Sequence, residues 1–229
     1  MFYRLNKIFN VSIAILLVNM SFGQIKSLSK LNLQIDSLIN KSIGEKVFPG
    51  AQVYIKIGAE TIINKSFGHH TYDSLVKVEN NHLYDLASLT KIIGTMPLII
   101  DAVEKNQISL STKVKEMLPE WEQSNKADIT LKAMLSHYAQ LIPWIPFYKM
   151  TLTKEAKPDA KFYSPNATEN FTIPVAKNLY LDKNYIEIIE QTIKESPLLD
   201  SLDYVYSDLP YYLLKKYLTK IKGTKSKKE

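Results

Sequence analysis

The sequence predicts an α+β fold in which a helix and an antiparallel hairpin precede a mainly helical lobe. Three features carry this prediction: helical spacing of apolar residues up to Gly44, period-two alternation over residues 53–63, and helical periodicity from Ser88 onward. With 229 residues, of which 45% are hydrophobic, the chain can fill one core, arranged in one or two lobes. The 23% charged content argues against a disordered or fibrous protein.

Residues 1–23 are predicted to be a secretory signal peptide. Two basic residues precede an apolar run that starts at Ile8, and the small residues Ser21 and Gly23 follow it. We expect cleavage before Gln24 and an exported mature protein, either periplasmic or secreted. Asparagines interrupt the apolar run, which is short for a bilayer span, so an uncleaved anchor is the weaker alternative and no stable membrane span is expected after cleavage.

The mature chain is expected to start with a helix and a hairpin. Apolar residues recur at helical spacing from Leu28 to Ile43, and Gly44 is placed to end that helix. Val53, Ile55 and Ile57 then alternate before a glycine-containing break, and a second β-branched run follows at residues 61–63. This pattern is typical of two antiparallel strands.

Helical periodicity dominates the rest of the chain. The helices are predicted at Leu89–Glu104, Val114–Trp121, Ile129–His137, Tyr185–Ile193 and Tyr211–Ile221. The segment between the third and fourth helices, residues 141–174, is aromatic and loop-like.

Charge and cysteine content limit the possible functions. The net charge is +6, and residues 215–229 account for all of it, because seven of the 29 basic and one of the 23 acidic residues lie there. The remaining body is neutral, so nucleic acid is not an expected partner. The lysine-rich tail could contact anionic lipid, but a frayed, solvated end is the favoured interpretation. Because the chain has no cysteine, thiol catalysis and disulfides are excluded.

Ser88 and Lys91 lie where a polar segment turns into a long apolar helix. The same S-x-x-K spacing also starts at Ser27 and Ser74, so the spacing by itself is weak evidence and an ordinary polar helix start remains an alternative. Only Ser88 opens a long apolar helix, on which residues three apart share a face. The lysine amine is therefore expected to reach the serine hydroxyl.

This position would suit nucleophilic chemistry. The partial positive charge of a helix N-terminus disfavours a second cation, so we expect it to lower the pKa of Lys91 toward the range of a base. The backbone N–H groups of the same turn can stabilise an oxyanion formed on Ser88. A neutral lysine beside a serine can activate the hydroxyl without a histidine.

Five short motifs occur in the order and rough spacing of one family: "YDLASLTK", "LPEW", "ITLKAMLSH", "WIPFY" and "YSDLPYYLL". From about Ile35 to Leu214 the chain resembles the serine β-lactamase-like hydrolases, which include class C β-lactamases, low-molecular-weight penicillin-binding proteins and related esterases. It is most similar to β-lactamase-like modules that accompany exported bacterial glycoside hydrolases. The resemblance implies a β-lactamase/transpeptidase-like fold and an acyl-enzyme mechanism.

The resemblance assigns roles to four residues. Ser88 would be the acylated nucleophile, Lys91 its partner, and Tyr206 the relay that carries the proton to and from the leaving group. Asp208 would take the supporting position that is usually Asn, where its charge would keep Lys91 protonated and shift proton transfer toward Tyr206. An aspartate accepts rather than donates hydrogen bonds, which weakens the case for ordinary β-lactam recognition. The plainer alternative makes Ser207 or Asp208 the N-cap of a helix, and both can hold together.

Other polar and aromatic residues are expected to be structural. His137 matches a position that fixes a loop in the family, and the other histidines show no metal-ligand spacing, so neither a metal nor a cofactor is expected. Trp144, Phe147 and Tyr148 could line a substrate groove, but burial in the core is favoured.

Members of this family carry a further motif, [KH]-T-G, on a strand beside the cleft. The sequence after the Y-S-D box (Tyr206, Ser207 and Asp208) has no good match to that motif. We therefore expect a β-lactamase-related domain at residues 24–214 whose C-terminal strands are missing and whose sheet is reduced to the N-terminal hairpin. Two functions stay open. One is an exported hydrolase acting on a peptidoglycan peptide, a β-lactam or an ester. The other is an inactive remnant or binding module, with a partner chain as a possible source of the missing strands.

Overall fold

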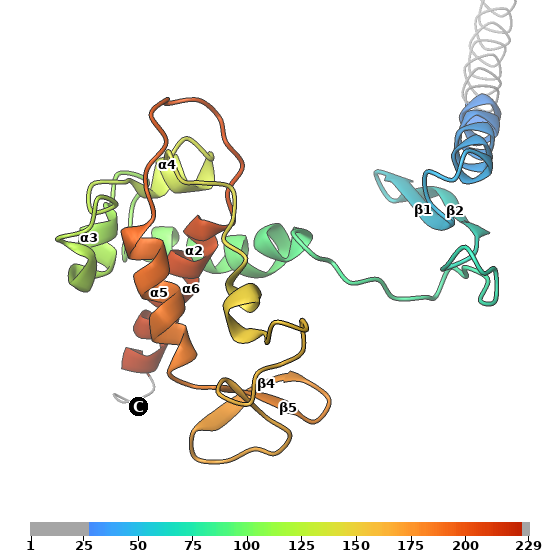
Figure 1. Cartoon of the computed structure of the whole chain (residues 1–229). Helices are drawn as coiled ribbons and strands as arrows, with labels where there is room; N and C mark the ends of the chain where they lie inside the picture. Colours follow the sequence, from blue (N-terminus) through green and yellow to red (C-terminus); the bar gives the residue numbers. More distant parts are fainter. Residues whose placement is uncertain (1–27, 226–229) are drawn as a thin grey trace, which may run out of the picture. The chain divides into compact units, whose positions relative to one another are not determined.

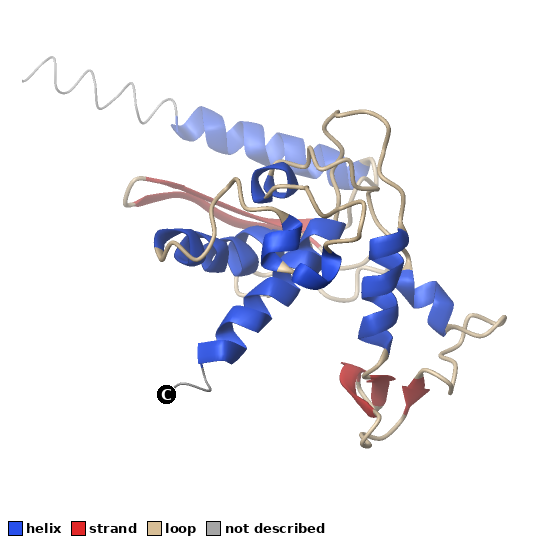
Figure 2. Ribbon diagram, turned by 90° about the vertical axis from the view of Figure 1, so that its left-hand side faces the viewer, coloured by secondary structure: helices blue, strands red, loops and turns tan. Residues whose placement is uncertain are grey.

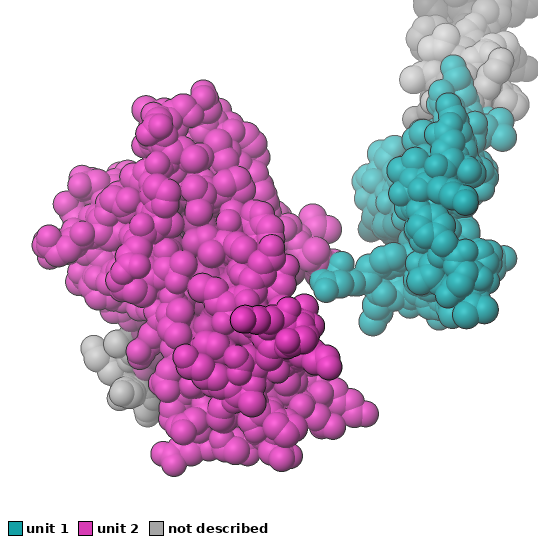
Figure 3. Space-filling view, viewed as in Figure 1, with its two compact units in different colours: residues 1–85 teal, residues 86–229 magenta. Residues whose placement is uncertain are grey.

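The computed structural model describes residues 28–225 (Figure 1). The chain divides into two compact units, of which unit 1 ends at Asp85 and unit 2 begins at Leu86 (Figure 3). The signal peptide predicted for residues 1–23 lies outside the described residues. No helix in the described range combines the length and the apolar content that a membrane crossing requires.

Unit 1 contains the helix and the hairpin that the sequence predicts. A helix spans residues 28–44, and β1 (Gly50–Ile57) pairs antiparallel with β2 (Glu60–Gly68). Gly68 pairs with Gly50 and has a φ of +63°, and a Cβ atom there would lie 2.3 Å from the carbonyl oxygen of Pro49. Glycine is therefore required at the open end of the hairpin, opposite the turn.

Unit 2 begins with the predicted helix of residues 89–104. After Leu89 and Thr90 it forms a single π-helical turn, η1 (Lys91–Thr95), and α2 (Met96–Glu104) continues it. The other predicted helices are confirmed with shifted ends: α3 (Val114–Met117) with the 3₁₀ turn η2 (Pro119–Trp121), α4 (Leu131–Leu135), α5 (Tyr185–Glu195) and α6 (Leu209–Lys225).

The core of unit 2 lies among these helices, which Figure 2 shows in blue. Leucines at helical spacing on α6 turn one face of that helix inward, and Trp121 fills the space beside α3. This packing fixes the start of α6 and the helix of residues 89–104, the two elements from which the candidate site is built. The least exposed members of the core are Ala102, Val114, Leu118, Trp121, Leu131, Met134, Ile193, Leu209 and Leu214.

The predicted antiparallel sheet of β1 and β2 is confirmed, but the prediction that residues 141–174 are only loop-like was wrong. The segment contains the 3₁₀ turn η3 (Phe147–Thr151) and two strands, β3 (Tyr163–Ser164) and β4 (Phe171–Ala176). With β5 (Leu179–Asp182) they form a small antiparallel sheet in the order β3-β5-β4. The signal was masked by prolines, since Pro174 lies within β4, an edge strand, where a missing N–H is tolerated.

The lysine-rich segment at residues 215–229 is not frayed over its described part. It continues α6 as far as Lys225, and Tyr217 and Leu218 within it are buried. Lys215, Lys216, Lys220 and Lys222 therefore lie on a helix that contributes to the core, and the interpretation as a solvated end is wrong for this part.

Candidate active site

Ser88 and Lys91 meet at the start of the helix of residues 89–104. The Nζ of Lys91 donates a hydrogen bond to the Oγ of Ser88 over 3.2 Å, and the Lys91 N–H donates to the Ser88 carbonyl over 3.0 Å. Ala87 immediately before has a φ of +42°, an unusual value for a residue with a Cβ atom. Such strain and π-helical turns both concentrate at functional sites. The local backbone thus presents the serine hydroxyl beside the amine.

The second half of the site comes from the segment that leads into α6. The Oδ1 of Asp208 lies 2.7 Å from the Nζ of Lys91, whose side chain is 18% exposed. The same Nζ lies 5.7 Å from the ring centroid of Tyr206 and 5.3 Å from that of Tyr211. Residues more than 110 positions apart in the sequence therefore converge on one ammonium group, all within unit 2.

The shift in the pKa of Lys91 is opposite to the one expected from its position at a helix N-terminus. Burial lowers the pKa of Lys91, but hydrogen bonds to Asp208 and Tyr206, together with their charges, outweigh burial and raise it above its ordinary value. Lys91 is therefore a cation at neutral pH. The expected lowering was wrong, whereas the expectation that Asp208 would keep Lys91 protonated matches the observed contacts.

Ser207 provides the helix cap that the sequence allowed as an alternative. The Leu209 N–H donates to the Oγ of Ser207 over 3.2 Å, and that hydroxyl donates to the carbonyl of Ile142 over 2.7 Å. The Asp208 N–H donates to the carbonyl of Pro143 over 2.8 Å. Capping by Ser207 leaves the carboxylate of Asp208 to pair with Lys91, so the two interpretations of this box hold together.

A cavity of about 310 Å³ opens beside the ion pair. Among its lining residues, Tyr211 and Lys215 of α6 were not singled out from the sequence. They lie three and seven residues after Asp208, so helical periodicity from the Y-S-D box could have found them. The cavity is lined mainly by Thr90, Lys91, Thr95, Asp208, Tyr211 and Lys215.

The aromatic residues of the 141–148 segment divide between core and surface. Phe147 is buried and packs edge-to-face on Tyr212 with 5.3 Å between ring centroids, as expected for a core residue. Trp144 and Tyr148 are both more than half exposed. Burial in the core was therefore the wrong prediction for these two residues, because the buried contacts of this segment are made by Leu141 and Phe147.

His137 lies against the same site from the end of α4. Its Nδ1 accepts a hydrogen bond from the Ser207 N–H over 3.2 Å. Burial lowers the pKa of His137, the charge of Lys91 lowers it further, and Asp208 opposes both. Among residues 28–225, no group of three or more His, Asp or Glu side chains is arranged to hold a metal ion.

Comparison with known proteins places the chain in a family. The model of the beta-lactamase family matches residues 35–227. Among curated proteins, Protein flp of Staphylococcus aureus strain NCTC 8325 is 26% identical over 106 residues, which is 45% of this chain and 21% of that protein. The chain therefore spans about a fifth of the length of the curated relatives it matches.

Solved structures share the fold at low sequence identity. EstCE1, described as a hydrolase with promiscuous acyltransferase activity, is 17% identical with a TM-score of 0.59, and the match covers 86% of this chain and 48% of that one. A class C beta lactamase from Rhodobacter sphaeroides is 18% identical with a TM-score of 0.56, covering 82% and 44%. The octameric penicillin-binding protein homologue from Pyrococcus abyssi is also 18% identical with a TM-score of 0.56, covering 83% and 39%. Since the family model covers most of its length, the chain belongs to the beta-lactamase family.

Proposed function

We propose that the protein is an exported serine hydrolase that forms an acyl-enzyme at Ser88. The observation that carries this proposal is the convergence of Ser88, Tyr206 and Asp208 on the ammonium of Lys91 within one unit. Family membership supports the same chemistry. Export rests on the signal-like pattern of residues 1–23.

In the acylation step, the Ser88 Oγ bonds to the substrate carbonyl carbon while its proton passes to the phenolate form of Tyr206, which the nearby Lys91 ammonium stabilises. The bond to the leaving group then breaks, and Tyr206 returns the proton to that group. Lys91 is a cation here, so it does not remove the proton. It stabilises the negative charge on the Ser88 Oγ and on the Tyr206 phenolic oxygen instead. Water then cleaves the Ser88 ester and releases the acid.

Among the substrates of this chemistry, we favour esters over lactams and peptides. The Asp208 carboxylate pairs with Lys91 and offers no N–H donor, whereas an amide side chain at that position could donate to a substrate carbonyl. An ester also releases an alcohol, which needs less help from a proton donor than an amine. A peptidoglycan peptide or a β-lactam remains a substrate class to be tested.

A second candidate function is binding without turnover, for which another chain could supply strands. One observation favours it. Within the described part of unit 1, β1 and β2 form a sheet of only two strands, an arrangement of marginal stability that pairing with a further strand would strengthen.

Covalent labelling separates the two functions. The purified full chain is incubated with a fluorophosphonate probe and with a fluorescent penicillin, and labelling is read on a denaturing gel. The Ser88→Ala protein should lose the label. The Ser74→Ala protein should keep it, because Ser74 begins another S-x-x-K sequence within residues 28–225 and serves as the matched control. Folded wild-type protein that takes up neither probe would support the binding function instead.

A further inference from the structure

We propose that His137 is a positioning residue that holds Tyr206 against the Ser88–Lys91 pair only while its imidazole is neutral, so that the site is switched off by acid. This inference rests on the proposed function for the role of Tyr206. It goes beyond the expectation that His137 merely fixes a loop.

Histidine is an unusual residue type for the backbone conformation at position 137. The Tyr138 N–H donates to the Ala133 carbonyl over 3.0 Å and the His137 N–H to the Met134 carbonyl over 3.3 Å, which is the Schellman pattern at the end of α4. His137 takes the left-handed position of that motif, with a φ of +61°. Glycine is the favoured residue there, so a histidine carries some strain and points to a role for the imidazole.

That imidazole belongs to a clamp around Tyr206. The Val205 N–H donates to the His137 carbonyl over 3.0 Å, and the Ser207 N–H donates to the His137 Nδ1 over 3.2 Å. The ring of His137 also lies 4.6 Å, centroid to centroid, from the ring of Tyr206. One residue therefore holds the backbone on both sides of Tyr206 and contacts its side chain.

The side-chain half of the clamp depends on protonation. Nδ1 can accept the Ser207 N–H only when it carries no proton, which requires the neutral imidazole with its hydrogen on Nε2. Protonation of Nδ1 would set two N–H groups against each other and add a second cation near Lys91. The surrounding structure favours the neutral form, because burial and Lys91 outweigh Asp208 and lower the pKa of His137.

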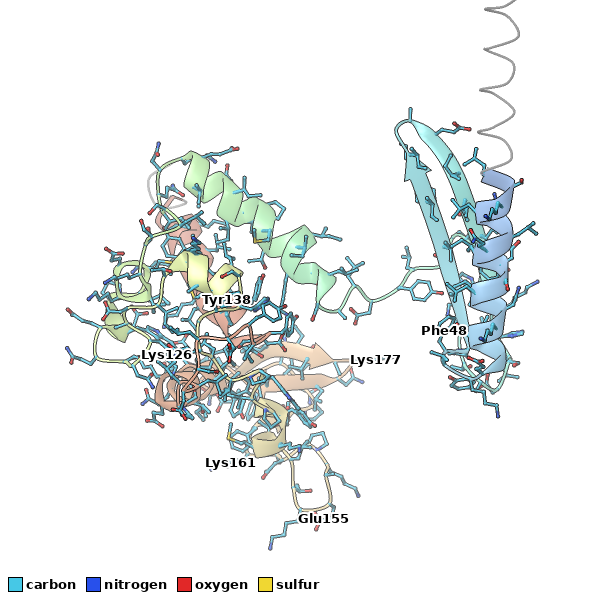
Figure 4. All side chains as sticks on the ribbon, turned by 90° about the horizontal axis from the view of Figure 1, so that it is seen from above. Phe48, Lys126, Tyr138, Glu155, Lys161 and Lys177 are labelled. Atoms are coloured by element: carbon cyan, nitrogen blue, oxygen red, sulfur yellow. The ribbon has the colours of Figure 1, made fainter. Side chains whose placement is uncertain are left out.

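Several other titratable groups face the imidazole. Two tyrosines approach it in addition to Tyr206: the ring of Tyr204 meets it edge-on at 5.9 Å and the ring of Tyr211 lies at 6.5 Å. The neighbouring Tyr138, labelled in Figure 4, packs on Tyr204. The charged groups are Lys91 and Asp208, which neutralise each other as an ion pair. His137 is therefore the group of this cluster whose ordinary pKa lies nearest to mildly acidic pH.

Two substitutions at His137 test the clamp without disturbing the helix end. Glycine and asparagine both tolerate the left-handed conformation, but only asparagine carries an acceptor, which does not titrate. We expect His137→Gly to melt at or above the wild-type temperature and yet to label Ser88 about 10- to 100-fold more slowly at pH 7.5. His137→Asn should label faster than His137→Gly and should lose the acid limb of the wild-type pH profile. Equal labelling rates for His137→Gly and wild type would overturn the proposal.

An NMR measurement keeps this test separate from the proposed function. In the full-length Ser88→Ala protein, ¹⁵N shifts should show the His137 ring protonated at Nε2 at pH 7.5, with a protonation midpoint below the ordinary 6.5. A hydrogen on Nδ1 would refute the clamp whether or not the wild type is labelled. If the shifts agree but the wild type takes up no probe, the clamp stands and the hydrolase proposal fails.

Discussion

Two ion pairs of nearly equal length lie in the two units and have different surroundings. In unit 1 the Nζ of Lys65 lies 2.8 Å from the Oδ1 of Asp36, and both side chains are more than a third exposed. In unit 2 the Nζ of Lys91 lies 2.7 Å from the Oδ1 of Asp208, but it also donates to Ser88 and faces two tyrosine rings. The first pair links a helix to β2, whereas the second is the centre of a candidate active site. The surroundings, rather than the pair distance, therefore distinguish the candidate active site from the pair in unit 1.

The two units also differ in how well they can hold such a constellation. Within the described residues, the buried apolar side chains of unit 1 are Ile63 and Val78, and the continuous core belongs to unit 2. A packed core confines side chains to one arrangement, which a small hairpin cannot do. The pair of the candidate active site therefore lies in the unit that can keep its geometry.

The largest difference in labelling rate is expected between two variants, each of which removes the lysine of one pair. Lys91→Met should slow labelling of Ser88 by about 10³-fold, because both the charge that stabilises the transition state and the hydrogen bond to the serine are lost. Lys65→Met removes a pair of the same length and should leave the rate within about twofold. Rates are measured with the fluorophosphonate probe. Similar losses in both variants would mean that the comparison between the pairs does not hold.

Truncating one leucine in each unit should separate their contributions to stability. Leu131, fully buried in unit 2, should lose about 2–5 kcal/mol of unfolding free energy on substitution by alanine, because a cavity is left. Leu38→Ala, at a 59% exposed position in unit 1, should change it by about 0.5 kcal/mol or less. Urea unfolding followed by circular dichroism gives both values. A large loss for Leu38→Ala would show that this leucine is covered in solution.

The core of unit 2 also encloses a lysine that gives stability a pH dependence. Lys126, labelled in Figure 4, is fully buried, and its Nζ donates to the Asn125 Oδ1 and to carbonyls at the end of α5. Burial lowers its pKa from 10.5 to about 8. Between these values the unfolded chain binds the proton and the folded chain does not, so stability rises with pH from about 8 toward 10.5.

The rise attributable to Lys126 should be on the order of 1–3 kcal/mol. It is the difference in the pH dependence of unfolding free energy between wild type and Lys126→Met, measured by urea unfolding between pH 7 and 10.5. The variant should lack the rise, even though its absolute stability also changes through the lost hydrogen bonds. Parallel pH curves for the two proteins would argue against a buried, perturbed lysine.

The smallest expected effect concerns the acidic partners of the two pairs. Asp208→Asn removes the carboxylate that contributes to raising the pKa of Lys91, so that pKa should fall and the alkaline limb of Ser88 labelling should move to lower pH. Asp36→Asn in unit 1 is the matched control and should leave the profile where it is. Labelling is followed between pH 6 and 11. An unchanged profile in Asp208→Asn would show that Lys91 does not govern the reaction.

Local elements were predictable because their signals are local. The helix of residues 89–104 was predicted at its observed ends from one apolar stripe, and the hairpin from alternation around a glycine break. The small sheet was missed because β3 has two residues and β4 contains Pro174. Short, proline-bearing strands carry little periodicity, and the pairing with β5 that stabilises them is not a local property.

The sequence by itself determined that Ser88 and Lys91 share one face of a helix start, because that relation spans less than one turn. It also carried the motifs of the family, from which Tyr206 and Asp208 were singled out. Only the tertiary structure decided the state of the lysine, since its pKa depends on a carboxylate and a phenol brought in by α6 packing. It likewise brought the His137 ring to its partner N–H, which is 70 residues away. Charge and hydrogen bonding act through space, and chain order does not encode the distances on which they depend.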